Sequence, residues 1–216
     1  MRVPGVTKSL IVRNGTTDPE VLWQVFVSQR FEPLLKLVHW EPKLIIDGGA
    51  YVGYSAALFA SAFPQAQVVA VEPDASNFKV LCANATRSVK PLRAGIWGVR
   101  ANIKIVDPHV GKWGLQTEIT STADPDGVST VTIPEILESS GQASIDILKL
   151  NVEGAEKEIF SADCGWLAHT RVLMVDLHDH MREGCTEAVF NSVKPFGFRA
   201  QFLNGSREHV IFSRDS

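Results

Sequence analysis

The stretch Lys43-Leu-Ile-Ile-Asp-Gly-Gly-Ala-Tyr-Val-Gly-Tyr-Ser55 is a short apolar run that stops at Asp47 and opens into three glycines. This pattern is typical of a buried strand, a tight loop and the start of a helix. A second apolar run, Val68-Val-Ala-Val71, ends on Glu72 and is followed at once by Pro73. A strand that ends on a carboxylate about 20 residues beyond a glycine-rich turn is how nucleotide-binding α/β proteins hold a ribose. The sequence therefore predicts a nucleotide-type ligand at these strand ends.

Composition limits the class of protein. The chain has 216 residues, enough for one α/β domain spanning residues 1–216 and too few for two full ones. Its 21 basic and 24 acidic residues give a formal charge of -3, so no nucleic-acid partner is expected. The three cysteines have no paired spacing, and no apolar run has the length of a signal peptide core or a membrane span. We therefore expect a cytoplasmic protein without a membrane partner.

Residues 1–40 are expected to form helices that cap the domain. Thr17-Asp18-Pro19 is typical of a helix start, and the apolar residues that follow share one helical face: Leu22, Val25 and Phe26. Three tryptophans with apolar neighbours are predicted to lie in the core: Trp23, Trp40 and Trp166.

Helices are predicted on both sides of the second strand. Residues 56–63 contain no glycine or proline and read as a buried helix that Pro64 ends. After the strand at residues 68–72, Pro73-Asp74 begins the next helix. Its apolar residues recur at helical spacing: Phe78, Leu81, Cys82 and Ala85. The spacing predicts that Cys82 lies in the core.

The alternation of strands and helices breaks after a third strand, predicted at residues 92–97. Residues 98–133 carry no convincing helix and are rich in Gly, Pro, Asp, Ser and Thr between strand-like segments at 101–106 and 128–133. We expect an irregular insertion built on a β-hairpin, placed before the fourth strand of the sheet. Trp113 in this insertion is predicted either to cover an acceptor or to fix the loop.

The remaining sequence returns to alternating elements. In chain order these are a short helix at 134–138 with Thr132 as its cap, a strand at 145–150, a helix at 153–160, a strand at 171–178, a helix at 186–194 and a hairpin of strands 198–203 and 209–213. The order predicts a parallel sheet with helices on both faces and an antiparallel terminal hairpin. Ligands of such sheets bind at the carboxyl ends of the strands. The side chains expected at that rim are Asp47, Glu72, Asn151 and His178.

The chemistry of the loop indicates which ligand binds there. A dinucleotide fingerprint requires glycine at three positions, and this loop offers Gly48, Ala50 and Gly53, with alanine where the backbone must approach a pyrophosphate. Asp47 at the mouth of the loop would repel a pyrophosphate and favour a cation. S-adenosylmethionine carries an ammonium, a sulfonium and a ribose diol but no phosphate, so we expect this cofactor, with Glu72 on the diol.

Three ordered motifs resemble one protein family. They are Ile46-Asp-Gly-Gly-Ala-Tyr-Val-Gly-Tyr-Ser55, Val69-Ala-Val-Glu-Pro-Asp-Ala-Ser-Asn-Phe78 and Ile145-Asp-Ile-Leu-Lys-Leu-Asn-Val-Glu-Gly-Ala-Glu156. Together they resemble the FkbM-family methyltransferases over about residues 43–200. The resemblance implies a class I, Rossmann-like fold with a mostly parallel seven-stranded sheet, S-adenosylmethionine as cofactor, and methyl transfer to an oxygen of a small-molecule acceptor such as a sugar or natural product. The third motif commonly reads Asp-Ile-Glu-Gly-Ala-Glu in the family, and here Asn151 replaces the Asp.

The resemblance places several residues on the cofactor side, namely Asp47, Gly49, Tyr51, Gly53, Ser55, Glu72 and Asn77. We add their neighbours Gly48, Ala50 and Pro73, and Asn151 for its amide. Ile96 and Trp97 follow the predicted third strand, where an adenine could stack.

His178 is the preferred general base, because an ordinary histidine pKa of about 6.5 suits neutral pH. Asp179 or Glu153 is expected to orient it or to replace it, while Asn151 cannot act as a base. Glu156 and Glu158 are assigned to the solvated face of a helix start.

Three alternatives stay open. His178-Asp-His180 has the alternate spacing of a strand and could bind a divalent metal, although such sites are rich in carboxylates and no metal ligand is assigned. The protein could also bind the cofactor without catalysis. An NAD-dependent oxidoreductase would use the same rim, but Ala50 and Asp47 count against it.

Overall fold

The computed structural model describes residues 1–106, 116–121, 124–203 and 205–214. Its main sheet has seven strands in the order β10-β11-β9-β8-β1-β2-β3. Their bounds are β1 Leu44–Gly48, β2 Gln67–Val71, β3 Val89–Leu92, β8 Ile145–Leu150, β9 Thr170–Asp176, β10 Arg199–Phe202 and β11 His209–Ser213. The first five run parallel, and β11 is antiparallel to both β9 and β10. The predicted sheet and its terminal hairpin are confirmed.

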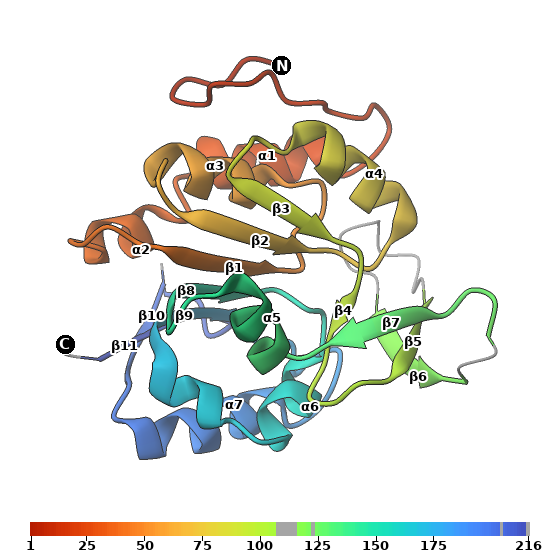
Figure 1. The fold of residues 1–216 in the computed structure, drawn as a ribbon, viewed down its shortest axis with the longest axis vertical. Coiled ribbons are helices and arrows are strands. Elements are labelled where there is room, and N and C mark those ends of the chain that lie inside the picture. The colour runs from red at the N-terminus through yellow and green to blue at the C-terminus, as the bar shows by residue number, and fades with distance from the viewer. Residues whose placement is uncertain (107–115, 122–123, 204, 215–216) are drawn as a thin grey trace.

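Helices cover both faces of this sheet (Figure 1). They are α1 Asp18–Phe26, α2 Glu32–Leu37, α3 Tyr54–Ala62, α4 Ala75–Asn84, α5 Ile133–Ser140, α6 Glu156–Ser161 and α7 Cys185–Val193. In β1, Ile45 packs with the cluster under α1, α3 and α4, whereas Leu44 and Ile46 pack with the cluster under α5, α6 and α7. Successive side chains of a strand point to opposite faces, so a strand buried on both sides must be apolar throughout. That explains the uninterrupted apolar runs of the sequence.

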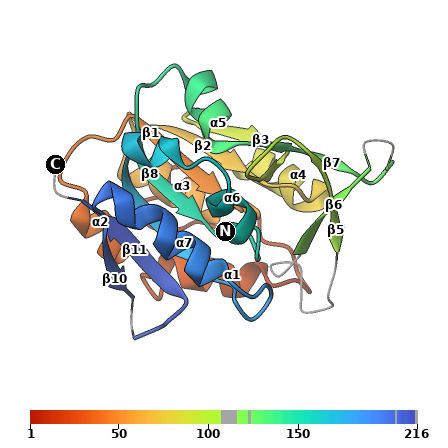
Figure 2. The same cartoon turned by 90° about the horizontal axis from the view of Figure 1, so that it is seen from below.

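The insertion forms a second sheet of four strands in the order β4-β7-β5-β6, which extends from one side of the molecule (Figures 1 and 2). Its strands are β4 Gly95–Ile96, β5 Asn102–Val106, β6 Gln116–Thr120 and β7 Val128–Val131. The prediction of one strand at 92–97 is wrong, because β3 ends at Leu92 in the main sheet and β4 pairs with β7 instead. The β5–β6 hairpin confirms the predicted insertion. Trp113 lies outside the described residues.

Helix α4 corrects the prediction for Cys82, which is exposed. The buried side of the helix runs through Asn77, Leu81 and Asn84. Asn84 is buried because its amide accepts from Ile11 N at 2.7 Å and donates to Val52 O at 2.9 Å. The buried side of α4 therefore includes two asparagines, which a prediction from the spacing of apolar residues places on the exposed side.

Helix α1 corrects a second core assignment. Trp23 is 55% exposed, because the helix buries Asp18, Leu22 and Val25 on its other side. Trp166 is buried as expected, and Trp40 is partly buried with its Nε1 donating to Asp146 Oδ1 at 3.0 Å.

Thr132 caps α5 as predicted, within a reciprocal capping box with Glu135. Two boundaries differ from the predictions near the rim of the sheet: β9 ends at Asp176, and α6 begins at Glu156. Within the described part of the chain, no helix is long and apolar enough to cross a bilayer.

Candidate functional site

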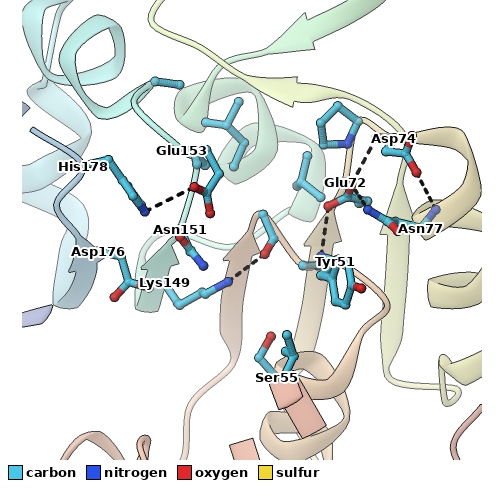
Figure 3. Close-up of a pocket in the computed structure, with 18 of the residues that line it drawn as sticks. Tyr51, Ser55, Glu72, Asp74, Asn77, Lys149, Asn151, Glu153, Asp176 and His178 are labelled. Atoms are coloured by element: carbon cyan, nitrogen blue, oxygen red, sulfur yellow. Dashed lines mark hydrogen bonds and ion pairs between the residues drawn. The ribbon is translucent and has the colours of Figure 1, made fainter. Parts of the chain in front are cut away.

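A cavity of about 400 Å³ lies at the carboxyl ends of the parallel strands (Figure 3). Its walls come from the β1–α3 loop, the ends of β2, β8 and β9, helix α1 and strand β5. Nine of the predicted cofactor residues line it, namely Gly49, Ala50, Tyr51, Ser55, Glu72, Pro73, Asn77, Ile96 and Asn151. Glu153 and His178 line it as well.

The β1–α3 loop depends on glycine at its first turn. Gly49 has φ +68°, and a Cβ atom there would lie 1.8 Å from the carbonyl oxygen of Asn151. On the same side, Asn151 N donates to Gly48 O at 3.0 Å. No other residue can bring the loop this close to the end of β8. The loop and the β8 end therefore form one continuous wall of the cavity.

Glu72 at the end of β2 is buried and held by several donors. Its Oε2 accepts from Tyr51 N at 2.9 Å, and its Oε1 accepts from Asp74 N at 3.1 Å and Asn77 Nδ2 at 3.3 Å. Burial raises the pKa of Glu72 to about 7, although these hydrogen bonds act in the opposite direction. A buried carboxylate fixed in this way can accept two hydrogen bonds from a diol.

Asp47 does not have the role expected of it. It is fully buried beneath the loop, where its Oδ1 lies 3.0 Å from Lys149 Nζ and its Oδ2 accepts from Ser55 Oγ at 2.6 Å. Lys149 also donates to Gly49 O at 2.8 Å. The charge of Asp47 is thus neutralised inside the protein, and the expectation that it attracts a cation at the loop mouth is wrong. Sequence reasoning did not find Lys149, whose apolar neighbours in β8 gave no sign of an ion pair.

Three further predicted cofactor residues lie behind the cavity wall. Gly48 and Gly53 leave room for neighbours, since a Cβ atom would meet Ile96 Cδ1 at 2.7 Å and Leu81 Cδ1 at 2.6 Å, respectively. Trp97 is 2% exposed within the hydrophobic cluster under α6, so its predicted stacking on an adenine is wrong. The chain turns at β4 so that Ile96, and not Trp97, reaches the cavity.

Glu153 follows β8 in a strained backbone conformation. Its φ is +52°, which is uncommon for any residue except glycine and concentrates at functional sites. Its side chain is only 8% exposed, and its Oε2 makes no hydrogen bond with the described residues. Burial raises the pKa of Glu153 to about 7, with Glu156 adding to the rise and His178 opposing it.

His178 lies two residues beyond the end of β9, between two carboxylates. Its Nδ1 is 2.8 Å from Glu156 Oε1. Its Nε2 is 3.5 Å from Glu153 Oε2, and Figure 3 shows this second contact. Burial alone would lower the pKa of His178, but the bond to Glu156 and the charges of Glu156 and Glu153 raise it to about 9. His178 is therefore a cation at neutral pH, and the argument from an ordinary histidine pKa is wrong.

Glu156 is the residue that orients His178. It is fully buried, and its Oε2 accepts from Gly154 N at 3.0 Å, so the assignment to a solvated helix face is wrong. The signal that could have found it is the third motif, which ends on this glutamate. Glu158, by contrast, is partly exposed and pairs with Arg182 at 2.9 Å.

The structure contradicts the predictions that Asp179 orients His178 and that His178 and His180 share one side of a strand. Asp179 is exposed and accepts from Gly184 N at 3.1 Å and from Thr186, which ties the loop to the start of α7. It does not orient His178. The rings of His178 and His180 lie 5.7 Å apart, in a turn after β9 and not on a strand. Among the described residues, no group of three or more His, Cys, Asp and Glu side chains has the arrangement of a metal site.

A second charged cluster lines the cavity beside His178. Asp176 Oδ1 accepts from His209 at 2.9 Å, and Asp176 Oδ2 pairs with Arg30. Burial alone would raise the pKa of Asp176, but the hydrogen bond from His209 and the charge of Arg30 hold it well below its usual range. None of these three residues was predicted, because they come from the α1–α2 loop, β9 and β11 and meet only in the fold.

Solved structures share this architecture. The precorrin-6y C5,15-methyltransferase from Geobacter metallireducens is 14% identical, with a TM-score of 0.52 over 100% of each chain. The N-terminal domain of human METTL16, solved in complex with S-adenosylhomocysteine, is 13% identical, with a TM-score of 0.54 over 98% of this chain and 77% of that one. These likenesses show the fold, which is that of the class I S-adenosylmethionine methyltransferases.

Sequence comparison identifies the family. The hexuronic acid methyltransferase AglP from Haloferax volcanii is 24% identical over 165 residues, which are 74% of this chain and 67% of AglP. The methyltransferase FkbM domain matches residues 47–206, which include the glycine loop, Glu72 and the Glu153–His178 pair. The chain therefore belongs to the FkbM family of methyltransferases.

Proposed function

We propose that this protein transfers a methyl group from S-adenosylmethionine to a hydroxyl oxygen of a small molecule of the sugar class. The observation that carries the proposal is the arrangement of the cavity. Glu72, a buried carboxylate held by three donors, directly follows β2, and Glu153, a buried carboxylate with an oxygen that makes no hydrogen bond among the described residues, lies in the loop after β8.

The residues of the β2 side fit the cofactor. Asn151 Oδ1 is a buried acceptor without a hydrogen bond among the described residues, and it borders the loop that Gly49 keeps free of side chains. An ammonium group would satisfy that oxygen, and Glu72 would accept from the ribose diol. When bound, S-adenosylmethionine supplies an electrophilic methyl group on its sulfonium. In this proposal Asn151 binds the ammonium through its amide oxygen, a role that does not require the Asp that the family commonly has.

Glu153 is the better candidate for the general base. A hydroxyl acceptor loses its proton as its oxygen is methylated, and a base works best when its pKa lies near the working pH. Glu153 meets that condition, whereas His178 already holds a proton below about pH 9. The His178 cation stabilises Glu153 as a carboxylate, and Glu156 holds the imidazole in place. The proton of the acceptor hydroxyl would pass to a carboxylate oxygen of Glu153.

The acceptor class is supported by the relative's name and by the polarity of the β9 side. AglP is a hexuronic acid methyltransferase. In this chain, Arg30, Asp176 and His209 supply both donors and acceptors to the cavity wall. A polyol can use both kinds of group at once.

A transfer assay tests this proposal. The protein is incubated with S-adenosylmethionine and a panel of hexuronic acids, neutral hexoses and phenols, and mass spectrometry follows methylated product and S-adenosylhomocysteine. Mild alkaline treatment then separates methyl ethers, which survive, from methyl esters, which hydrolyse. We expect an alkali-stable methylated sugar. An alkali-labile product would mean a carboxylate acceptor, and binding of S-adenosylhomocysteine without transfer to any acceptor would mean a binding protein without catalysis.

A further inference from the structure

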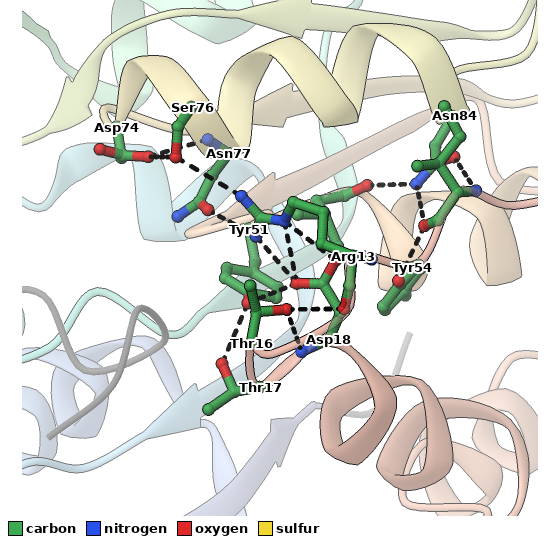
Figure 4. Close-up of polar contacts among 12 residues, drawn as sticks. Arg13, Thr16, Thr17, Asp18, Tyr51, Tyr54, Asp74, Ser76, Asn77 and Asn84 are labelled. Carbon is green, nitrogen blue, oxygen red and sulfur yellow. Dashed lines mark hydrogen bonds and ion pairs between the residues drawn. The ribbon is translucent and has the colours of Figure 1, made fainter.

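The N-terminal segment, residues 1–17, passes over α3 and α4 and reaches Tyr51 and Asn77, which line the cavity (Figures 1 and 4). It lies outside the residues that match the family. Leu10 is buried, and Ile11 is fixed at both backbone atoms, with Ile11 N donating to Asn84 Oδ1 at 2.7 Å and Tyr54 Oη donating to Ile11 O at 2.9 Å. The segment is therefore packed against the domain up to the point where Arg13 begins its contacts.

Asp18 is the centre of those contacts and is fully buried. It accepts from Arg13 N at 2.8 Å, from Arg13 Nη2 at 2.8 Å and from Tyr51 Oη at 2.6 Å. A buried carboxylate is costly unless it is paired and hydrogen-bonded, and here two partners meet that demand. One partner, Tyr51, belongs to the glycine-rich loop.

The contacts close into a ring that includes Glu72. Arg13 Nη2 also donates to Asn77 Oδ1 at 2.9 Å, and Asn77 Nδ2 donates to Glu72 Oε1 at 3.3 Å. Tyr51 N donates to Glu72 Oε2 at 2.9 Å (Figure 3). The Tyr51 side chain leads back to Asp18, because its hydroxyl donates to Asp18 Oδ1 at 2.6 Å (Figure 4). We call the pair Arg13 and Asp18 the N-terminal clasp.

The clasp fixes two features of the groups that hold Glu72. Because Arg13 can only donate, Asn77 must present its oxygen to Arg13 and its amide nitrogen to Glu72. Tyr51 has φ +52°, a conformation that a non-glycine residue keeps only when its surroundings hold it. Burial, together with Asp18, raises the pKa of the Tyr51 hydroxyl to about 12, so it remains a donor to Asp18.

We infer that the N-terminal clasp is part of the cofactor site: Arg13 and Asp18 are positioning residues that hold Tyr51 and Asn77 in the geometry in which Glu72 binds the ribose diol. The inference rests on the proposed function, since it assumes that the cofactor contacts Glu72. It assigns a binding role to a segment that the family match does not include.

Calorimetric titration with S-adenosylhomocysteine tests the clasp in the variant Tyr51→Phe, which removes only the hydroxyl that donates to Asp18 and lies 3.0 Å from Thr17 Oγ1. Trp40→Phe is the matched control. It also removes one aromatic donor from a buried aspartate, because Trp40 Nε1 donates to Asp146 Oδ1 at 3.0 Å, and Asp146 also lies near an arginine, Arg171. This second site lies at the amino ends of the strands, where Lys43 N and Leu44 N donate to Asp146.

We expect Tyr51→Phe to weaken S-adenosylhomocysteine binding about tenfold, and Trp40→Phe to change it less than about twofold, at similar losses of melting temperature. Equal, small changes in affinity for the two variants would overturn the inference.

Arg13→Lys provides a second test, because lysine keeps the charge but cannot span Asp18 and Asn77 as the arginine fork does. It should weaken binding as Tyr51→Phe does, and wild-type affinity in Arg13→Lys would contradict the clasp. If the wild-type protein itself does not bind S-adenosylhomocysteine, it is the proposed function that fails.

Discussion

The carboxylates on the two sides of the cavity have different hydrogen-bond partners. The β2 side holds Glu72, and the β9 side holds His178 with Glu153, which faces it. On the β2 side, Glu72 accepts from neutral donors, two backbone N–H groups and the amide of Asn77. On the β9 side, Glu153 faces a charged imidazole and has an oxygen without a hydrogen bond among the described residues. Burial raises the pKa of both carboxylates to about 7, so the pKa does not distinguish them. What differs is that both oxygens of Glu72 already accept hydrogen bonds that fix the side chain, whereas Glu153 Oε2 faces the His178 imidazole and is available to take a proton. We infer that the β2 side binds the cofactor and the β9 side handles the proton.

This difference separates two measurable quantities. Changes on the β2 side should alter cofactor affinity, and changes on the β9 side should alter the rate and its dependence on pH. Gly49 and Asn151 join the two sides, because the loop and the end of β8 touch there. A substitution at this junction should instead lower the stability of the wall that the two sides share.

Glu153→Gln should give the largest effect. It keeps the size of the side chain but removes the base, so we expect kcat to fall about 10²- to 10⁴-fold while the Kd for S-adenosylhomocysteine stays within about twofold. Steady-state kinetics and calorimetry measure the two quantities. Glu158→Gln is the control, since Glu158 lies in the first turn of α6, pairs with Arg182 at 2.9 Å and is not among the residues that line the cavity, so this substitution should leave kcat unchanged. Normal turnover of Glu153→Gln would place the base elsewhere.

Gly49→Ala tests the junction. A Cβ atom 1.8 Å from Asn151 O forces the backbone to move, so we expect a loss of about 3 kcal/mol in the free energy of unfolding. Chemical denaturation measures that loss. Gly141→Ala is the control, since Gly141 also has a left-handed φ of +71° but has no atom within 4 Å of the added Cβ. Equal losses in the two variants would show that the backbone conformation, and not the contact with Asn151, requires glycine at position 49.

Glu72→Gln should weaken cofactor binding by about 2 kcal/mol, because a neutral amide presents one acceptor oxygen where the carboxylate presents two. The turnover at saturating cofactor should change much less. Titration with S-adenosylhomocysteine and kinetics at high S-adenosylmethionine concentration measure these two effects. An unchanged Kd would contradict the assignment of Glu72 to the ribose.

His178→Asn should shift the pH profile of kcat/KM. The base must be deprotonated, so activity rises as pH passes the pKa of Glu153, which is about 7 in the wild-type protein. The His178 cation lowers that pKa, so its removal raises it, and we expect the midpoint to move upward by about one pH unit. If His178 were itself the base, wild-type activity would instead rise near pH 9, and the variant would not recover at high pH.

The two sides also differ in how far the sequence predicts them. Gly49 and Glu72 act within local motifs, and their spacing along the chain is sufficient to place them. The ion pair of Lys149 with Asp47 and the cluster of Asp176, Arg30 and His209 form between segments far apart in sequence. No local pattern marks such partners.

A residue can also be buried where its sequence pattern predicts exposure, or exposed where the pattern predicts burial. An acidic residue in the first turn of a helix is usually solvated, yet Glu156 is fully buried because His178 and two backbone N–H groups satisfy it. Cys82 has the spacing of a core residue, yet Asn77 and Asn84 take the buried side of α4. In both cases hydrogen bonds to distant parts of the chain decide which side chain is buried. The spacing of apolar residues along the sequence carries no information about those hydrogen bonds.

The most direct test of the account is a single calorimetric experiment that compares S-adenosylhomocysteine binding to the wild-type protein, Glu72→Gln and Glu153→Gln under the same conditions. We predict that the wild-type protein and Glu153→Gln bind with the same Kd within about twofold, and that Glu72→Gln binds roughly 30-fold more weakly, the equivalent of about 2 kcal/mol. Equal weakening by the two substitutions, or no binding to the wild-type protein, would contradict the division of the cavity into a cofactor side and a proton-transfer side.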